Sequence, residues 1–95
     1  MPAYVIALVN ITDPERYETY RQLVPPTIAA YGGRFIARGG RTEVLEGALA
    51  PGRVVLLEFP SVELAKEWWS SAEYSEAKAI RQATSEGTLI VIEGV

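Results

Sequence analysis

Two arginines set among apolar residues are the first candidates for chemistry. Arg38 ends the alternating stretch RFIAR (Arg34–Arg38), so it faces either the helix-covered side of a sheet or water. On the covered side its guanidinium would need an acidic partner or a ligand carboxylate. Arg81 lies between Ile80 and Ala83 on the apolar side of a predicted helix, where it would bind an anion or pair with a nearby glutamate. We predict both arginines as ligand-binding residues.

Glu58 is the candidate for proton transfer. It follows four apolar residues near the end of a predicted strand, and a buried carboxylate there could act as a general base. The alternative is a partly exposed glutamate paired with an arginine. The chain has no histidine and no cysteine, which removes the commonest general base and the usual haem and transition-metal ligands. We therefore expect no metal and no other cofactor.

Aromatic residues form the third candidate group. Trp68, Trp69 and Tyr74 come from one helical region and Tyr20 from an earlier one. Because adjacent helical residues point about 100° apart, only one of the two tryptophans can sit centrally in a core. The other would line a cleft, an interface or the surface, where a planar ligand could stack. Trp69, Tyr74 and Tyr20 are predicted ligand contacts, and simple core or dimer packing is the alternative.

Composition limits the class of protein. The 95 residues allow one domain, residues 1–95, and 48% hydrophobic with 22% charged residues is a balance typical of globular domains. With a net charge of −3, the chain lacks the excess of basic residues that is typical of nucleic-acid binding. The same negative charge disfavours adsorption to anionic membranes. The longest apolar run, Ala3–Val9, is far shorter than a membrane span. We expect a cytoplasmic protein without nucleic-acid or membrane partners.

Two Gly-Gly-Arg sequences raise the alternative of a phosphate-binding loop. They lie in YGGRFIARGGR (Tyr31–Arg41). Phosphate-binding glycines stand between a strand and a following helix, whereas the first pair here follows a predicted helix. The pattern favours a strand over Arg34–Arg38, with Gly39-Gly40 as a bulge or bend and Thr42–Glu46 continuing extended.

Capping and turn residues mark the other predicted elements. Thr12 is the expected cap of a helix that kinks or breaks at Pro25-Pro26 and ends at Gly32. The remaining elements are, in order, strand Tyr4–Val9, a turn over Gly47–Gly52, strand Arg53–Phe59, helices capped by Ser61 and Ser71, and, after a helix end at Gly87, strand Thr88–Glu93.

The order strand, helix, strand, strand, helix, strand is that of the ferredoxin-like βαββαβ fold. This is an α+β fold with a four-stranded antiparallel sheet and helices on one face. Three of the predicted strands (4–9, 53–59 and 88–93) are apolar on both sides, although helices would cover only one. Soluble monomers rarely expose such a face. We predict a homodimer through the sheet face, a dimeric α/β barrel.

Six short motifs, spread over nearly the whole chain, carry a resemblance. They are YGGRFIARGG (Tyr31–Gly40), LEG (Leu45–Gly47), EFPS (Glu58–Ser61), WWSSAEY (Trp68–Tyr74), Arg81 and VIEG (Val91–Gly94). Together they resemble the domain-of-unknown-function 1330 family, except that tyrosine is usual where Trp69 stands and proline where Ala72 stands. That family is placed in the dimeric α/β barrel superfamily, so the resemblance implies the fold and a dimer. The superfamily includes cofactor-less monooxygenases, isomerases of small ring compounds and haem enzymes, so no single activity is implied.

These candidates give two functional hypotheses. In the first, a pocket between the first helix, the Trp/Tyr helix and the sheet binds or transforms a small organic acid or aromatic compound without metal or haem. Arg38 or Arg81 would hold the acid, Trp69 or Tyr74 would stack, and Glu58 or a tyrosine would move a proton. In the second, the chain is a non-catalytic dimeric binding or interaction module. A void of roughly 300 Å³ or more, lined by these residues, would favour the first.

Overall fold

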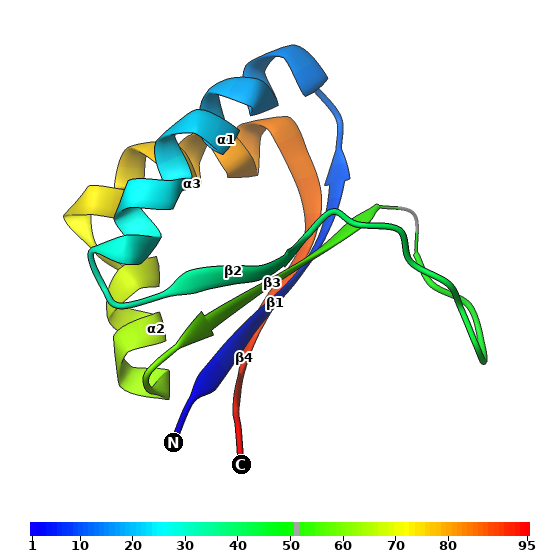
Figure 1. Ribbon diagram of the computed structural model, residues 1–95. Coiled ribbons are helices and arrows are strands. Elements are labelled where there is room, and N and C mark those ends of the chain that lie inside the picture. The colour runs from blue at the N-terminus through cyan, green and yellow to red at the C-terminus, as the bar shows by residue number, and fades with distance from the viewer. Residues whose placement is uncertain (51) are drawn as a thin grey trace.

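A computed structural model describes residues 1–50 and 52–95 and has the expected α+β architecture. Four strands form one sheet in the order β2-β3-β1-β4, and every neighbouring pair is antiparallel. Figure 1 shows the helices on one face of this sheet and the opposite face uncovered. The ferredoxin-like order is confirmed, with two helices in its second helical segment. The elements are β1 (Ala3–Ile11), α1 (Pro14–Ala29), β2 (Arg34–Arg38), β3 (Arg53–Phe59), α2 (Val62–Trp69), α3 (Ala72–Thr84) and β4 (Ser85–Glu93).

Alternation along the strands gives the sheet two apolar faces. Every second residue of β1, from Ala3 to Val9, is buried beneath the helices. The residues between them face the other way, and there Ile6 pairs with Leu56 of β3 on one side and Ile90 of β4 on the other. We call this uncovered side the open sheet face. Its apolar members are Tyr4, Ile6, Leu8, Val54, Leu56, Ile90 and Ile92.

The core fills the space between the inner face of the sheet and the helices. The Trp68 ring stacks on Tyr74 with the ring centroids 4.1 Å apart and packs on Phe59 at 5.4 Å. Its indole nitrogen donates a hydrogen bond to the Thr27 hydroxyl at 3.1 Å. Trp68 is therefore the core tryptophan, and Trp69, which is 43% exposed, faces outward.

Asp13, rather than the predicted Thr12, caps the start of α1. The Asp13 carboxylate accepts a hydrogen bond from the Arg16 backbone N–H at 3.2 Å. Thr12 has a different task, because its backbone N–H donates to the Thr84 carbonyl at 2.8 Å. Thr12 thereby ties the end of α3 to the turn that precedes α1.

Of the kink or break predicted at Pro25-Pro26, the break is wrong, since α1 runs without interruption over Pro14–Ala29. A proline inside a helix removes one N–H donor and leaves the carbonyl four residues earlier without its helical partner. Helical bonding resumes at once, because the Ala30 N–H donates to the Pro26 carbonyl at 3.1 Å. Gly32, with φ of 77°, provides the predicted left-handed end.

The chain leaves the sheet at Gly39, directly after β2. Gly39 has φ of 69°, and its N–H donates to the Val54 carbonyl at 3.0 Å. The prediction that Thr42–Glu46 continues as an extended strand is wrong, because the positive φ of Gly39 turns the backbone off the sheet. The exposed loop that follows projects away from the body of the molecule, on the side opposite the helices (Figure 1).

Strand β4 begins at Ser85, three residues before the predicted Thr88. β1 is nine residues long and offers a backbone partner to all nine residues of β4. The helix therefore ends at Thr84, and Gly87, predicted as the helix end, lies within the strand. A Cβ on Gly87 would collide with the Leu8 carbonyl, so this strand position requires glycine.

Other predicted boundaries are confirmed. β3 has the expected bounds, Arg53–Phe59. The Ser61 hydroxyl accepts from the Leu64 N–H, and the Ser71 hydroxyl from the Tyr74 N–H, each at 3.1 Å. The predicted turn at 47–52 includes residue 51, which lies outside the described residues.

Candidate functional site

A bulge in β2 decides which way Arg38 points. Phe35 pairs with Leu57 and Arg38 with Val55, and all four positions belong to the inner face of the sheet. Regular alternation would place residues three apart on opposite faces. The extra residue is Ile36, so the bulge lies there, and of the bulge or bend predicted at Gly39-Gly40 the structure has a bend at Gly39. Of the two directions that the sequence left open, Arg38 takes the one toward the helix-covered side of the sheet.

A proline in α1 supplies the partner of Arg38. Because Pro25 has no N–H, the carbonyl of Arg21, four residues earlier, has no helical donor. The Arg38 side chain fills this place, with Nη2 donating to the Arg21 carbonyl at 2.8 Å. The guanidinium of Arg38 also lies over the Phe35 ring, 4.3 Å from its centroid. This polar contact joins β2 to α1, and it depends on both the bulge in β2 and Pro25 in α1.

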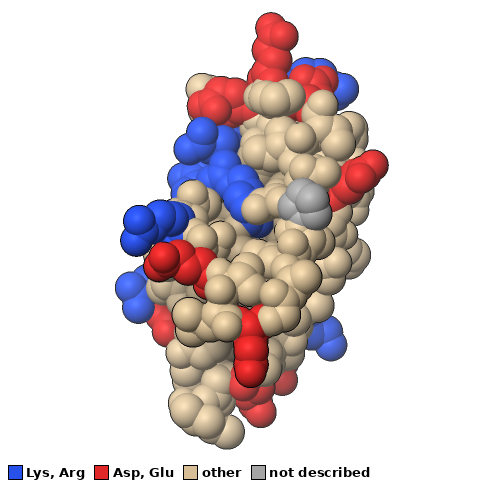
Figure 2. Space-filling view, turned by 90° about the vertical axis from the view of Figure 1, so that its right-hand side faces the viewer, with Lys and Arg blue, Asp and Glu red and all other residues tan. Residues whose placement is uncertain are grey.

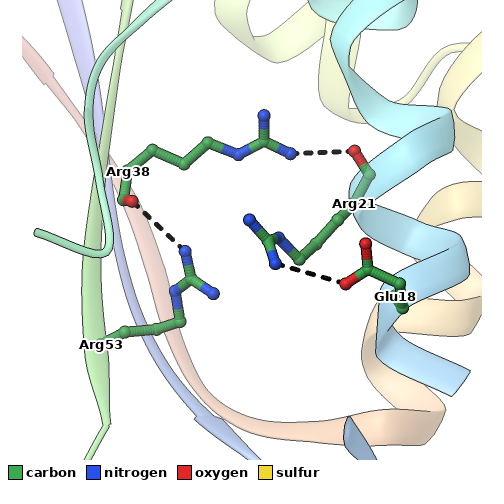
Figure 3. Close-up of polar contacts among 4 residues, drawn as sticks. All are labelled: Glu18, Arg21, Arg38 and Arg53. Carbon is green, nitrogen blue, oxygen red and sulfur yellow. Dashed lines mark hydrogen bonds and ion pairs between the residues drawn. The ribbon is translucent and has the colours of Figure 1, made fainter. Parts of the chain in front are cut away.

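Arg53 and Arg21 point into the same space. Arg53 Nη2 donates to the Arg38 carbonyl at 3.3 Å, while its Nε is buried and has no hydrogen-bond partner among the described residues. Gly39 makes room for this guanidinium, with which a Cβ would collide. Arg21 Nη1 forms an ion pair with Glu18 at 3.2 Å. Figure 3 shows the three guanidinium groups between α1 and the sheet, and we call Arg21, Arg38 and Arg53 the arginine cluster.

The arginine cluster borders a cavity of about 30 Å³ between α1 and the inner face of the sheet. Arg81 lines it as well, together with Tyr17, Tyr20 and apolar side chains, and no described carboxylate does. Four of the nine lysines and arginines therefore meet here, in a chain whose net charge is −3. Viewed from the side of the projecting loop, Lys and Arg side chains gather on one part of the surface (Figure 2). Positive charge is concentrated locally on an acidic protein.

Arg81 is held by a chain of hydroxyl groups. Its Nε donates to the Tyr74 hydroxyl at 3.1 Å, and that hydroxyl shares a hydrogen bond of 3.1 Å with the hydroxyl of Tyr20. Burial, reinforced by neighbouring Tyr74, raises the pKa of Tyr20 far above its usual range. Burial also raises the pKa of Tyr17, although the positive charges of Arg53 and Arg81 oppose this shift. Both tyrosines thus stay protonated and neutral at ordinary pH.

A groove of about 700 Å³ lies on the other side of Arg81, between α2, α3 and β4. We call it the α2–α3 groove. Trp69 lines it, and Lys78 fixes that residue by donating to its carbonyl at 3.0 Å and lying 3.9 Å from its ring centroid. The other lining residues are Val5, Ala65, Lys66, Trp68, Ser70, Gln82, Ser85, Glu86, Gly87, Leu89 and Val91. Apolar side chains and polar or charged ones, Lys66 and Glu86 among them, contribute to the lining in similar numbers.

The predicted site residues therefore lie in four different places: the small cavity, the α2–α3 groove, the core and the open sheet face. Arg38 and Tyr20 line the small cavity, Trp69 lines the groove, and Arg81 borders both. Tyr74 is fully buried behind Arg81, so it positions that side chain and offers no ring face to a ligand.

Glu58 stands apart from the others. It pairs with Tyr4 across the sheet, which puts its side chain on the open sheet face, and it forms an ion pair of 2.8 Å with Arg34. This is the partly exposed, arginine-paired arrangement that the sequence left as the alternative. The sheet separates Glu58 from both the cavity and the groove.

The sequence interpretation did not single out Arg21 or Arg53. A signal for Arg21 was present, since Pro25 four residues later implies that its carbonyl needs a donor from outside the helix. Arg53 opens β3 after Gly52 and gave no comparable signal. Its proximity to Arg38 depends on the β2–β3 register and on the turn at Gly39.

Two further properties bear on the class of site. Over residues 1–50 and 52–95, no group of three or more acidic side chains is arranged to hold a metal ion. No helix in this part of the chain combines the length and apolarity needed to cross a bilayer.

Comparison with family models gives one match over almost the full sequence. The model described as "Domain of unknown function (DUF1330)" matches residues 2–95. A search of curated proteins finds no match.

Solved structures share the fold. The RPA0582 protein of unknown function from Rhodopseudomonas palustris has a TM-score of 0.80 at 24% identity, covering 99% of this chain and 82% of that one. SnoaB, a cofactor-independent oxygenase from Streptomyces nogalater, has a TM-score of 0.60 at 6% identity over 99% and 93%. A dimeric protein of unknown function and ferredoxin-like fold from Bacteroides fragilis has 0.55 at 17% over 98% and 96%. At these identities the similarity establishes the fold alone.

Proposed function

The chain belongs to the DUF1330 family, and from that premise we propose that it binds a small organic acid with an aromatic or apolar body in the α2–α3 groove. The observation that carries the proposal is a ligand-sized groove with an anchored arginine at its wall. Ligand sites typically occupy about 300–1,000 Å³ and are mainly apolar with a few placed polar groups. A groove of about 700 Å³ is within this range and exceeds the volume at which we favour ligand binding over a filled interior.

Arg81 is the group that would receive the acid. Its Nε is held by the Tyr74 hydroxyl, and no carboxylate among the described residues lies within 4.0 Å of its guanidinium nitrogens. A positioned guanidinium that lacks an internal acid is suited to a carboxylate, which accepts its N–H donors in pairs. Trp69 would contact the ligand body, because the residue is 43% exposed although Lys78 covers one part of its ring.

Titration with benzoate and with its uncharged analogue benzamide tests the proposal. We expect benzoate to bind, and benzamide to bind about tenfold to a hundredfold more weakly, because a charge-assisted hydrogen bond contributes about 1.5–3 kcal/mol. Arg81→Gln should remove this preference for benzoate, while Trp69→Ala should weaken both compounds. Isothermal titration calorimetry measures all four combinations.

Arg41→Gln is the matched control, because it makes the same charge change at a side chain that is 86% exposed and distant from the groove in sequence. Its affinity for benzoate should equal that of the unmodified protein. Equal binding of benzoate and benzamide, or benzoate affinity unaffected by Arg81→Gln, would contradict the assignment of Arg81.

We also propose that two copies pack through the open sheet face. Ile90 and Ile92 lie on β4 at the edge of this apolar face, where they are 49% and 53% exposed. The dimeric ferredoxin-like protein from Bacteroides fragilis supports the proposal, since its fold is the same. Such packing would cover the apolar face and leave the α2–α3 groove on the helix side of each copy.

A further inference from the structure

We propose that the arginine cluster is a second binding site, specific for a small oxyanion. Its members, Arg21, Arg38 and Arg53, lie between α1 and the β2–β3 edge of the sheet (Figure 3). This site is separate from the α2–α3 groove and does not depend on the function proposed for that groove. Arg81 borders both spaces, but none of the three cluster arginines lines the groove.

The charge balance of the cluster calls for an anion. Three guanidinium groups share the space, and the one carboxylate bound to them is Glu18, which pairs with Arg21. Arg38 and Arg53 donate to backbone carbonyls, and neither has an ionic partner among the described residues. Like charges repel strongly where water is partly excluded. A bound oxyanion would attract all three guanidinium groups and offset this repulsion.

An unmet hydrogen bond points to the same place. Arg53 Nε is buried without an acceptor, and a buried donor left unpaired costs about 1–3 kcal/mol. The guanidinium lies next to Gly39, where any Cβ would collide with it. An oxygen atom of a bound anion would satisfy Nε and would also accept from the free N–H groups of Arg38.

The cavity indicates how much of a ligand can enter. Its volume of about 30 Å³ admits a water-sized group, such as one oxygen atom of an oxyanion, and no larger body. Arginine forks match the geometry of carboxylate and phosphate. Arg21 and Arg38 are exposed at the rim, which leaves the rest of a larger ligand free to remain in solvent. The chemistry is thus that of a carboxylate or phosphate group.

Side-chain NMR tests the site directly. The Nε–H signal of Arg53 in ¹⁵N-labelled protein should shift saturably when inorganic phosphate or acetate is added at constant ionic strength set with chloride. We expect a dissociation constant of about 1 mM for the anion of the preferred class. A response to phosphate alone identifies a phosphate group as the natural ligand group, and a response to acetate alone identifies a carboxylate.

Three variants separate a specific site from general attraction of anions. Arg53→Gln and Arg38→Gln should each weaken the preferred anion about tenfold, the loss of one charge-assisted contact. Arg38 lies at the exposed rim, so its variant tests the proposal even where Arg53→Gln unfolds. Arg41→Gln, with the same charge change, should bind as the unmodified protein does. Absence of saturable shifts with both anions would overturn the proposal, as would equal weakening by Arg41→Gln and Arg38→Gln.

Discussion

At the scale of single residues, the hydroxyl of Tyr20 links protein stability to pH. Burial raises the pKa of Tyr20 well above the value near 10 of an unfolded chain. Below pH 10 the group is neutral in both states, and its contribution to stability is fully present. Above pH 10 the unfolded chain loses the proton while the folded chain keeps it, so the free energy of unfolding falls as pH rises.

The expected slope follows from this difference in bound protons. Above pH 10, Tyr20 should lower the free energy of unfolding by about 1.4 kcal/mol per pH unit. Tyr20→Phe removes the titrating group, so its stability should fall less steeply by this amount. At neutral pH the variant should be about 1 kcal/mol less stable, because the bond to the Tyr74 hydroxyl is lost. Urea unfolding between pH 8 and pH 11 measures both quantities, and parallel curves for the two proteins would refute the role of Tyr20.

The surroundings of single residues also explain which candidate site residues could be identified from the sequence. The sequence singled out Arg38 and Arg81 because cations among apolar residues require partners, and both side chains line cavities. Tyr74, predicted as a ligand contact, is fully buried, because periodicity shows that a ring is on the inner side of a helix but not that other rings cover it. Arg53 was missed, because its importance comes from contacts across strands.

At the scale of elements, α1 has a proline that stabilises a contact outside the helix. Pro25 leaves the Arg21 carbonyl to Arg38, and Pro25→Ala would return an N–H donor to that carbonyl. We expect Arg38 to lose its anchor, so binding of the preferred anion to the arginine cluster should weaken about threefold to tenfold. Helix stability should rise, since an interior proline costs about 3 kcal/mol relative to alanine. Anion titration and thermal unfolding of one variant test both statements.

Pro26→Ala is the matched control for this prediction. It restores a donor to the carbonyl of Gln22, which Arg38 does not contact. Its effect on helix stability should resemble that of Pro25→Ala, and its anion affinity should stay unchanged. Equal affinities for the two variants would show that the freed carbonyl does not position Arg38.

The elements themselves were largely predictable, whereas their details depended on tertiary pairing. Apolar runs and caps at Ser61 and Ser71 were sufficient to place the sheet and two helices. The start of β4 was not visible locally, because it depends on the length of β1. The bulge at Ile36 was also hidden, and it reverses the direction of Arg38. A shift of one residue in pairing therefore decides which way Arg38 points, although it leaves the fold unchanged.

At the scale of the whole molecule, the open sheet face has the character of an interior. Ile6 lies at its centre, flanked by Leu56 and Ile90 on neighbouring strands. The loop after Gly39 projects on the same side and carries Leu45, which is 97% exposed (Figure 1). Sheet-to-sheet packing of two copies would bury the face and bring this loop toward the partner, a closed arrangement about a two-fold axis.

Ile6→Glu tests this arrangement, because a charge at the centre of the face would be buried without a partner in the dimer. Sedimentation at micromolar concentration should give a dimer for the unmodified protein and a monomer for Ile6→Glu. Ala79→Glu, on an exposed position of α3, adds the same charge and should remain dimeric. The monomeric variant should keep its arginine cluster, which lies on the helix side of each copy. A monomer for the unmodified protein would mean that the apolar face stays in water, and a dimer for Ile6→Glu would place the interface elsewhere.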